Sequence, residues 1–169
     1  MEAAPELWNQ TREIILLVGK SGSGKNHIIR SLGLKPVVTY TTRPMRPGEQ
    51  QGVEHHFVNA IEYPEQRIQT IQNSPDTLGF TRFNGNNYWF TVHDIDGDVV
   101  TVDPDGIRFF RSKGPRLAYR IVYLDCPWYR RMWRMHKRGD SWRNIVSRLR
   151  HDRDAFRGVR KYAEYIINV

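Results

Sequence analysis

The sequence has 169 residues, of which 39% are hydrophobic and 12% aromatic, and this composition excludes a largely disordered chain. A chain of this length can bury the core of one domain without disulfides or a structural metal, and its single cysteine, Cys126, has no intrachain partner. No apolar run approaches the roughly 20 residues of a membrane-spanning helix, and residues 1–12 lack the pattern of a signal peptide. We therefore expect a soluble, cytoplasmic, single-domain protein.

The charge of the chain indicates a phosphorylated partner or a basic surface that maintains solubility. Lys and Arg total 26 against 18 Asp and Glu, which gives a formal net charge of +8. Most of the basic residues are arginines. A planar guanidinium group can bind phosphate through two parallel hydrogen bonds, whereas lysine acts as a mobile point charge. Charge alone leaves the two interpretations equally open.

The first 52 residues predict two strands, a helix and a loop. Residues 13–18 are an apolar run rich in β-forming residues, which Gly19 ends, and they predict a buried strand. Residues 24–32 predict a helix, and residues 37–42 predict a second short strand. The Pro- and Gly-rich stretch 43–52 predicts a loop.

A region rich in hairpin signals follows. Residues 53–58, 78–83 and 88–92 have the pattern of antiparallel strands. The Asn- and Gly-rich segment 84–87 predicts the turn between the last two of them. Residues 61–73, in between, predict a helix.

Strands and helices alternate in the remainder of the chain. Residues 99–102 and 120–124 are apolar runs, each followed by a Pro-containing turn and a helical segment. Residues 141–165 predict a helix and residues 166–169 a final strand. This alternation predicts an α/β fold in which helices flank a central parallel sheet, with the region 37–92 inserted beside it.

Residues 19–25 read Gly-Lys-Ser-Gly-Ser-Gly-Lys and match the phosphate-loop pattern G-x-x-x-x-G-K, between a predicted strand and a predicted helix. In such a loop, backbone amides surround the β-phosphate and the lysine, here Lys25, neutralises charge between the β- and γ-phosphates. Asn26 stands where Ser or Thr normally contacts Mg²⁺. An ordinary Gly-rich turn is the alternative interpretation. The predicted ATP-binding residues are Gly19, Ser21, Gly22, Ser23, Gly24, Lys25 and Asn26.

The segment after the second predicted strand resembles the nucleoside-monophosphate site of guanylate kinases. It reads Thr-Tyr-Thr-Thr-Arg-Pro-Met-Arg-Pro-Gly-Glu over residues 39–49, which is similar to the family signature T-T-R-x-x-R-x-G-E. Gly-Asn-Asn-Tyr at 85–88 and Val-Asp-Pro-Asp-Gly at 102–106 extend the resemblance along the chain. It implies a P-loop kinase fold with a core (13–36, 93–128, 151–169), a small antiparallel monophosphate-binding region (37–92) and an Arg-rich helical lid (about 129–150).

The same resemblance implies an enzyme that transfers a phosphoryl group from ATP, with Mg²⁺, to a nucleoside monophosphate. Arg43, Arg46 and Tyr88 would hold the acceptor phosphate. His55 stands where the family has a phosphate-binding tyrosine, and it could donate a hydrogen bond in its place. Asn168, in the last predicted strand, would lie near the adenine.

Asp103 follows directly after the apolar run 99–102. It is placed like the acid that orients hydrated Mg²⁺ in such kinases. The predicted metal contacts are therefore Asn26 and Asp103, partly through water. A turn aspartate that caps the following helix is the alternative interpretation.

Ten arginines lie between Trp128 and Arg160. The resemblance favours Arg138 and Arg148 as lid residues that neutralise the transferring phosphoryl group, with Arg134 as a further candidate. Lys25, Arg43, Arg138 and Arg148 form the predicted catalytic set. Most of the other arginines are expected on a solvated helix surface, because one site uses only two or three.

The resemblance also predicts a changed base preference. Guanylate kinases read guanine with a Ser or Thr, a Glu, a Ser and an Asp, and Thr39 and Asp105 match the first and the last. Gly79 stands at the Glu position and Phe90 at the Ser position, so the carboxylate that would accept from guanine is missing. This environment suits a different base, such as that of dTMP or a modified pyrimidine deoxynucleotide.

Other interpretations remain open. The chain could be a true GMP or dGMP kinase, or a kinase of the same fold that acts on a phosphorylated sugar. A non-catalytic interaction module is a third possibility, for which Asn26 is the only hint. The fourth is nucleic-acid binding, because aromatic residues interleave with the arginines; these residues are Trp128, Tyr129, Trp133 and Trp142. Aromatics at helical spacing more often pack in a core or a lid, so we expect neither nucleic acid nor a membrane as a partner.

Overall fold

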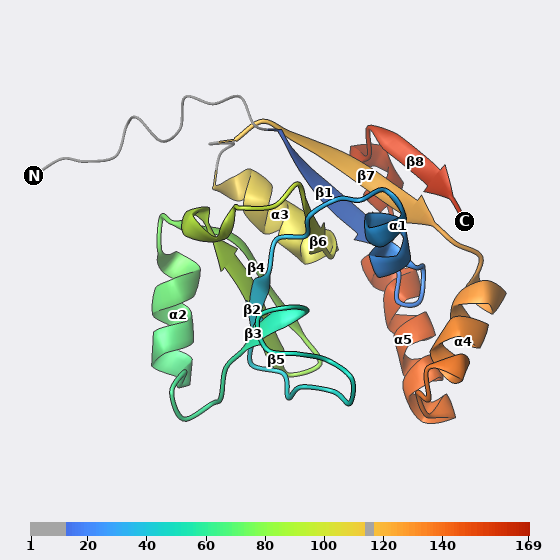
Figure 1. Ribbon diagram of the computed structural model, residues 1–169, viewed down its shortest axis with the longest axis horizontal. Coiled ribbons are helices and arrows are strands. Elements are labelled where there is room, and N and C mark those ends of the chain that lie inside the picture. Colours follow the sequence, from blue (N-terminus) through green and yellow to red (C-terminus); the bar gives the residue numbers. More distant parts are fainter. Residues whose placement is uncertain (1–12, 114–116) are drawn as a thin grey trace, which may run out of the picture.

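The computed structural model describes residues 13–113 and 117–169, which form two four-stranded sheets with helices packed against them (Figure 1). Residues 1–12, over which the sequence lacks a signal-peptide pattern, lie outside the described residues. None of the described helices has the length and apolar character needed to cross a bilayer.

The first sheet is parallel. Its strands lie in the order β6 (Val99–Val102), β1 (Ile14–Gly19), β7 (Tyr119–Asp125) and β8 (Tyr165–Asn168). Leu16 packs on one face of β1 in a cluster with Phe110 of α3 (Pro104–Ser112). Leu17 packs on the other face with Ile29 of α1 (Lys25–Ser31). Helices therefore cover both faces of the sheet, as the alternation of strands and helices predicted.

The second sheet is mixed. Its strands lie in the order β3 (His55–Phe57), β2 (Thr39–Thr41), β5 (Asn86–Thr91) and β4 (Thr77–Phe83). β4 and β5 form the expected antiparallel hairpin, and its two-residue turn places Asn84 at φ 49° and Gly85 at φ 74°, the positive φ values that a type I′ turn requires.

The expectation that this whole inserted region is antiparallel is wrong for β3. β3 runs parallel to β2, with Thr39 opposite His55 and Thr41 opposite Phe57. A parallel pair needs a crossover of about a dozen residues or more, and the loop 42–54 is long enough to provide it.

Two helices differ in length from the sequence prediction. α2 (Glu65–Asn73) begins after Pro64, because a proline disfavours the helical conformation of the residue that precedes it. α5 (Trp142–Ala155) ends well before residue 165: Gly158 adopts φ 79°, and the short 3₁₀ turn η3 (Val159–Tyr162) then leads into β8.

The second sheet and the pair of helices α4 (Trp128–Lys137) and α5 lie on opposite sides of the loop that joins β1 to α1 (Figure 1). A second 3₁₀ turn, η2 (Val92–Asp94), follows β5. Met135 of α4 and Ile145 of α5 are fully buried, so the helix pair has its own packed interior. We call the second sheet and this helix pair, the helical arm, the two arms of the protein; residues of both line one cavity at the carboxyl ends of β1 and β6.

Candidate active site

A cavity of about 490 Å³ occupies the space at the carboxyl ends of β1 and β6, where parallel α/β sheets bind their ligands. It brings together residues that are far apart in the sequence. The predicted site residues that line it are Gly19, Ser21, Gly22, Ser23, Gly24, Lys25, Asn26, Thr39, Arg43, Arg46, His55, Gly79, Tyr88, Phe90, Asp103, Asp105, Arg138 and Arg148. Asn168 does not line the cavity; it is exposed in β8, opposite Asp125.

The loop between β1 and α1 has the backbone geometry of an anion-binding turn. Gly22 and Gly24 have φ values of 75° and 96°, which residues with a side chain rarely adopt. A Cβ atom on Gly22 would also lie 2.8 Å from the carbonyl oxygen of Arg131. The loop is therefore held tightly against α4, and its amide groups stand at the start of α1, where a helix favours bound anions.

Lys25 lies across this loop. Its Nζ donates a hydrogen bond to the carbonyl oxygen of Gly19 at 2.5 Å. Burial lowers the pKa of Lys25 from 10.5 to about 8, and the negative charges of Asp152 and Asp103 partly oppose this effect. A bound polyphosphate would add negative charge beside the ammonium group and favour its protonated form.

A buried ion pair fixes the phosphate loop from the side of α5. Oδ2 of Asp152 accepts hydrogen bonds from the backbone N–H of Ser21 at 2.9 Å and from Nη1 of Arg131 at 2.8 Å. Both side chains of the ion pair are at least 95% buried. The expectation that most lid arginines lie on a solvated surface is therefore wrong for Arg131, whose charge is neutralised inside the protein.

Arg134 also contacts the phosphate loop. Its Nη1 donates to the carbonyl oxygen of Ser23 at 2.7 Å and lies 3.0 Å from the position of a Cβ on Gly24. Arg134 therefore places a guanidinium group at the wall of the cavity beside the start of α1.

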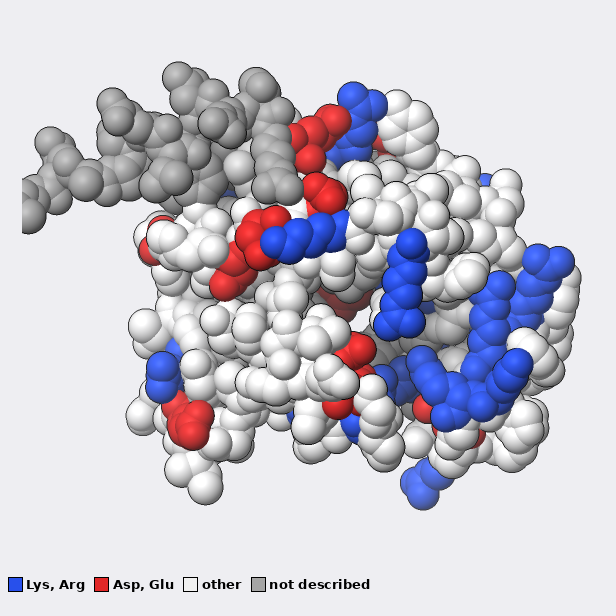
Figure 2. Space-filling view, viewed as in Figure 1, with Lys and Arg blue, Asp and Glu red and all other residues white. Residues whose placement is uncertain are grey.

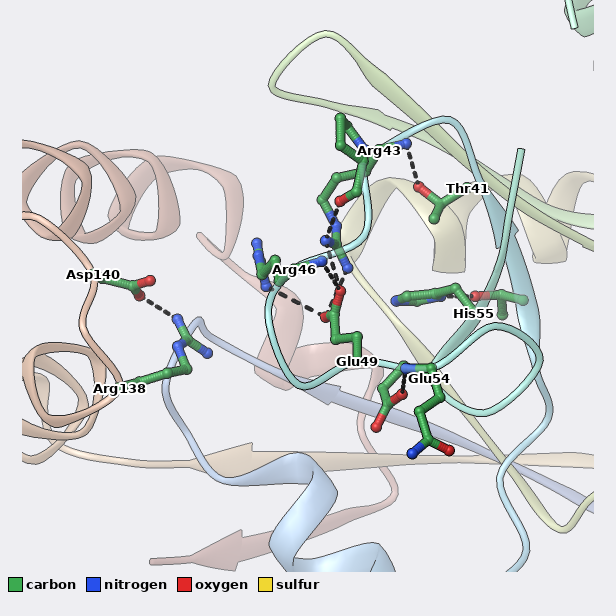
Figure 3. Close-up of polar contacts among 11 residues, drawn as sticks. Thr41, Arg43, Arg46, Glu49, Glu54, His55, Arg138 and Asp140 are labelled. Atoms are coloured by element: carbon green, nitrogen blue, oxygen red, sulfur yellow. Dashed lines mark hydrogen bonds and ion pairs between the residues drawn. The ribbon is translucent and has the colours of Figure 1, made fainter. Parts of the chain in front are cut away.

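On the opposite arm, Glu49 organises the two arginines of the loop after β2 (Figure 3). Arg43 forms a two-point ion pair with Glu49, with both N–O distances at 2.9 Å, and its side chain is 10% exposed. The backbone N–H of Arg46 donates to the same carboxylate at 2.8 Å. Glu49 therefore holds the loop in shape while the side chain of Arg46 remains 41% exposed.

The side chain of Arg46 lies in a cluster of positive charge that spans the cavity. Burial and the nearby charges of Arg43, Arg148 and Arg138 lower the pKa of Arg46. Figure 3 shows Arg138, which pairs with Asp140, extending from the helical arm toward the loop that carries Arg46 and Glu49. Like charges gathered at the mouth of a cavity repel each other and favour a bound anion between them.

His55 faces this cluster from β3. Its Nδ1 lies 2.8 Å from Oγ1 of Thr39, and its ring meets the ring of Tyr88 edge to face at 5.9 Å. Burial and the charge of Arg43 lower the pKa of His55 from its ordinary value, which favours the neutral form of the ring. The three side chains form one wall of the space beside Arg43 and Arg46.

Gly79 and Phe90 lie opposite each other on β4 and β5. A Cβ on Gly79 would lie 1.9 Å from Cε1 of Phe90, which means that the Phe90 ring fills the space of a side chain at position 79. Phe90 is 2% exposed and packs near Phe110 of α3. Asp76, the other acid near this hairpin, is not among the residues that line the cavity.

Comparison with known proteins shows which family this chain resembles. The guanylate kinase family model matches residues 10–168. The chain belongs to the guanylate kinase family. It is 29% identical over 170 residues to a guanylate kinase of Vibrio parahaemolyticus, covering 92% of this chain and 79% of the relative. It is 36% identical over 141 residues to a guanylate kinase of Idiomarina loihiensis, covering 75% of this chain and 62% of the relative.

The fold is also that of a solved guanylate kinase. The crystal structure of the enzyme from Anaplasma phagocytophilum superposes with a TM-score of 0.59 at 17% identity, over 95% of this chain and 79% of the other. Family membership makes this chain a nucleoside monophosphate kinase, that is, an ATP-dependent phosphotransferase.

The residues at the predicted metal position fit the Mg²⁺ that guanylate kinase chemistry generally uses. Asp103 caps α3 by accepting a 2.7 Å hydrogen bond from the N–H of Gly106, and it accepts a second one from Oγ1 of Thr81 at 2.7 Å. The carboxylate of Asp103 therefore caps α3, as the alternative interpretation of this aspartate predicts. It also lines the cavity, as Asn26 does. Mg²⁺ is usually held by one or two such oxygen ligands together with phosphates and water, and the chemistry of these two side chains is compatible with that ion.

Sequence reasoning missed three of the residues that shape this guanylate kinase site. Glu49 lies in the motif at residues 39–49, but that motif does not predict its ion pair with Arg43. Asp152 and Arg131 are separated by 21 positions within an Arg-rich segment, and nothing in the local sequence distinguishes them from the exposed charges around them. The signal that could have found them is the single acid on the face of α5 that also carries the apolar residue Ile145.

The aromatic residues of the helical arm are not packed in a core. Of the predicted packing in a core or a lid, the core part is wrong, because each of the four is more than half exposed; they are Trp128, Tyr129, Trp133 and Trp142. The interior of the arm is filled instead by Met135, Ile145 and the Arg131–Asp152 pair.

Proposed function

We propose that this member of the guanylate kinase family transfers the γ-phosphoryl group of ATP to a nucleoside monophosphate whose base is not guanine. The acceptor that suits the site best is a pyrimidine deoxynucleotide such as dTMP or a 5-substituted relative. The packing of Phe90 over Gly79 carries this proposal, because it removes both the side chain and the space that a guanine-reading glutamate at position 79 would need.

The proposed acceptor site has an anionic end and a base end. Arg46, Arg43, His55 and Tyr88 face the acceptor phosphate, and Glu49 keeps Arg43 in place. Thr39 and Asp105 remain as hydrogen-bonding groups. Phe90 replaces a polar contact with apolar surface, which suits a smaller ring or one with a methyl group rather than the polar edge of guanine.

The proposed transfer depends on position and charge, since phosphoryl transfer needs no nucleophilic side chain from the protein. Lys25 and the amides of the phosphate loop hold the donor phosphates, with Arg138 and Arg148 on the lid side of the transferring group. Asp103 and Asn26 would hold Mg²⁺, which supplies neutralising charge at the phosphates when bound. Asn168 as an adenine contact is a further proposal.

A coupled ADP-release assay over a panel of ribo- and deoxyribonucleoside monophosphates tests the proposal. GMP and dGMP should be at least tenfold poorer in kcat/KM than the best acceptor, a difference of about 1.4 kcal/mol. A ribose 5-phosphate control in the same panel separates base recognition from the phosphorylated-sugar alternative. Absence of ADP release with every acceptor of the panel would instead favour a non-catalytic module.

A true GMP or dGMP kinase is the second candidate. Thr39 and Asp105, two of the four residue types with which guanylate kinases read guanine, line the cavity. The relatives in Vibrio parahaemolyticus and Idiomarina loihiensis are named guanylate kinases. This candidate is favoured if GMP leads the panel, in which case the base-preference proposal fails.

A further inference from the structure

Helix α4 exposes large aromatic side chains and buries a charged one, which is the reverse of the usual pattern for a surface helix. Arg131 and Met135 face inward and are 4% and 0% exposed. The exposed aromatic residues are Trp128, Tyr129, Trp133 and, at the start of α5, Trp142, with exposures from 52% to 61%. We call these four residues the aromatic surface. Clustered exposed aromatics on a soluble protein mark an interaction site.

The aromatic surface continues from one helix to the next. Tyr129 and Trp133 are one helical turn apart, about 6 Å along the axis of α4, and so share a face. His136 stacks on the Trp142 ring with the ring centroids 4.7 Å apart and the planes inclined at 23°. Nζ of Lys137 lies 5.1 Å from the centre of the Trp133 ring. Flat aromatic faces and positive charge therefore alternate across α4 and the start of α5.

The helical arm also concentrates the positive charge of the protein. Residues 128–155, which span α4 and α5, contain nine of the 26 Lys and Arg but only three of the 18 Asp and Glu, a formal net charge of +6 out of +8 for the whole chain. Lys and Arg gather over the α4–α5 side of the molecule in Figure 2. Within residues 13–113 and 117–169, no carboxylate forms an ion pair with Arg130, Arg143 or Arg150.

These basic groups adjoin the aromatic surface and are separate from the catalytic cavity. Arg143 and Arg150 line a shallow depression on α5 together with Trp142 and Val146. The arginines of the arm that face the nucleotide cavity are different ones, namely Arg134, Arg138 and Arg148. An occupant of the aromatic surface would therefore leave the catalytic arginines in place.

We propose that the aromatic surface, with Arg130, Lys137, Arg143 and Arg150, binds single-stranded nucleic acid. Bases can stack on exposed indole and phenol rings whatever their sequence, while phosphates pair with the cations, of which Lys137 lies beside the Trp133 ring. The chemistry favours this occupant over a second copy of the chain, since a symmetric contact would bring two helix pairs of formal net charge +6 together. It also favours it over a lipid surface, because exposed aliphatic side chains are scarce there, with Val146 the one at 42% exposure. From the sequence we expected no nucleic-acid partner, because aromatics at helical spacing more often pack in a core or a lid. These four side chains are instead exposed.

Titration of the full chain with a dT20 oligonucleotide that lacks terminal phosphates tests the inference. Binding is followed by quenching of tryptophan fluorescence and by fluorescence anisotropy of a labelled oligonucleotide. We expect saturable binding whose affinity falls with salt, with a slope of log K against log salt of roughly −2 to −3 if three or four cations contact phosphate. Trp133→Ala should weaken binding about 5- to 150-fold, and Trp133→Phe should retain most of it.

Matched charge reversals show where the oligonucleotide lies. The double variant Arg143→Glu and Arg150→Glu should abolish binding at physiological salt. Arg67→Glu, on α2 at the opposite end of the molecule, should leave binding nearly unchanged (Figure 1). Kinase activity with the best acceptor of the panel should persist in all of these variants, which shows that they fold. The inference does not depend on which base that acceptor carries.

Several results would overturn the proposal. Absence of oligonucleotide binding at low salt would do so, as would binding that Trp133→Ala and the Arg143/Arg150 reversal leave unchanged. Binding lost in Lys25→Met and displaced by ATP would place the oligonucleotide in the catalytic cavity instead. Sedimentation showing a dimer that Trp133→Ala dissociates would assign the aromatic surface to a second copy. Tighter binding to vesicles of anionic lipid than to dT20 would assign it to a membrane.

Discussion

The carboxylate of Asp152 reaches from α5 to the phosphate loop, where it accepts a 2.9 Å hydrogen bond from the backbone N–H of Ser21. The same oxygen accepts from Arg131 of α4. One buried carboxylate thus ties both α4 and α5 to the loop between β1 and α1. We therefore expect Asp152, which also lines the cavity, to act as a positioning residue for this loop.

Asp152→Asn should destabilise the protein by about 3–5 kcal/mol, because it leaves the buried guanidinium of Arg131 without a counter-charge. Denaturant unfolding followed by circular dichroism measures the loss. The double variant Arg131→Met and Asp152→Leu removes both charges and should recover most of the stability. If Asp152→Asn is as stable as the parent, the ion pair contributes nothing and the positioning role is wrong.

Lys25→Met should lower kcat by roughly 10²-fold or more while the fold survives. The substitution removes the cation that lies across the phosphate loop and leaves charge on the transferring group uncompensated. Single-turnover kinetics with the best acceptor, together with a thermal melt, separate loss of catalysis from loss of structure. Near-native turnover in Lys25→Met would contradict the assignment of the phosphate loop.

The lowered pKa of Lys25 predicts a pH effect on ATP binding. Below pH 8 the free enzyme has a charged Lys25, and above pH 8 it loses this proton, so kcat/KM for ATP should fall as pH rises through about 8. Bound phosphates raise the pKa of the ammonium group, so kcat should hold to higher pH. Asp152→Asn should move the fall to lower pH, because the Asp152 charge raises the pKa of Lys25. A profile that is flat to pH 9.5 would contradict this.

Arg46→Ala should weaken acceptor binding and slow transfer with little effect on ATP affinity. The Arg46 side chain is 41% exposed in the cavity and makes its close contact with Glu49 through its backbone, so its loss leaves the loop intact. Arg43→Ala should additionally perturb the loop, since it leaves the Glu49 carboxylate without its two-point partner. Calorimetric titration with ATP and then with the monophosphate distinguishes the two ligands; equal damage to both would contradict a separate acceptor site.

The parts of the fold that follow from local patterns could be predicted from the sequence. The apolar run 13–18, ended by Gly19, predicted β1, and the segment 84–87 predicted the hairpin turn, which the structure places at Asn84 and Gly85. The direction of β3 could not be predicted, because its parallel pairing with β2 depends on the path of the loop 42–54 rather than on residues within the strand.

The difference between features that follow from local sequence patterns and features that depend on tertiary packing applies to the site as well. The spacing of residues along the sequence predicts the phosphate loop and the arginines at 43 and 46. It does not predict which side chains of the Arg-rich arm are buried. Arg131 is inside and Trp133 is outside, although composition and helical spacing favour the opposite assignment. Arg131 is buried where α4 packs closely against the phosphate loop, and its guanidinium group pairs there with Asp152 of α5, a contact that the sequence of α4 does not reveal.

The contact between Gly79 and Phe90 allows the proposed base preference to be reversed by design. Gly79→Glu alone should unfold or strongly destabilise the protein, because its Cβ would lie 1.9 Å from the Phe90 ring in a buried strand. Phe90→Ser alone leaves a cavity and should cost about 3–5 kcal/mol. The double variant Gly79→Glu and Phe90→Ser relieves the clash and supplies a carboxylate that can accept from guanine N1–H and N2–H₂.

In the double variant, kcat/KM for GMP relative to the best natural acceptor should rise at least tenfold, since each restored hydrogen bond to a buried polar group contributes about 1–3 kcal/mol. The measurement is the same monophosphate panel, with Arg46→Ala in the double-variant background as a control that acceptor binding still uses the phosphate site. If the folded double variant has an unchanged ratio of GMP to pyrimidine activity, positions 79 and 90 do not read the base, and the preference must lie with Thr39 and Asp105 instead.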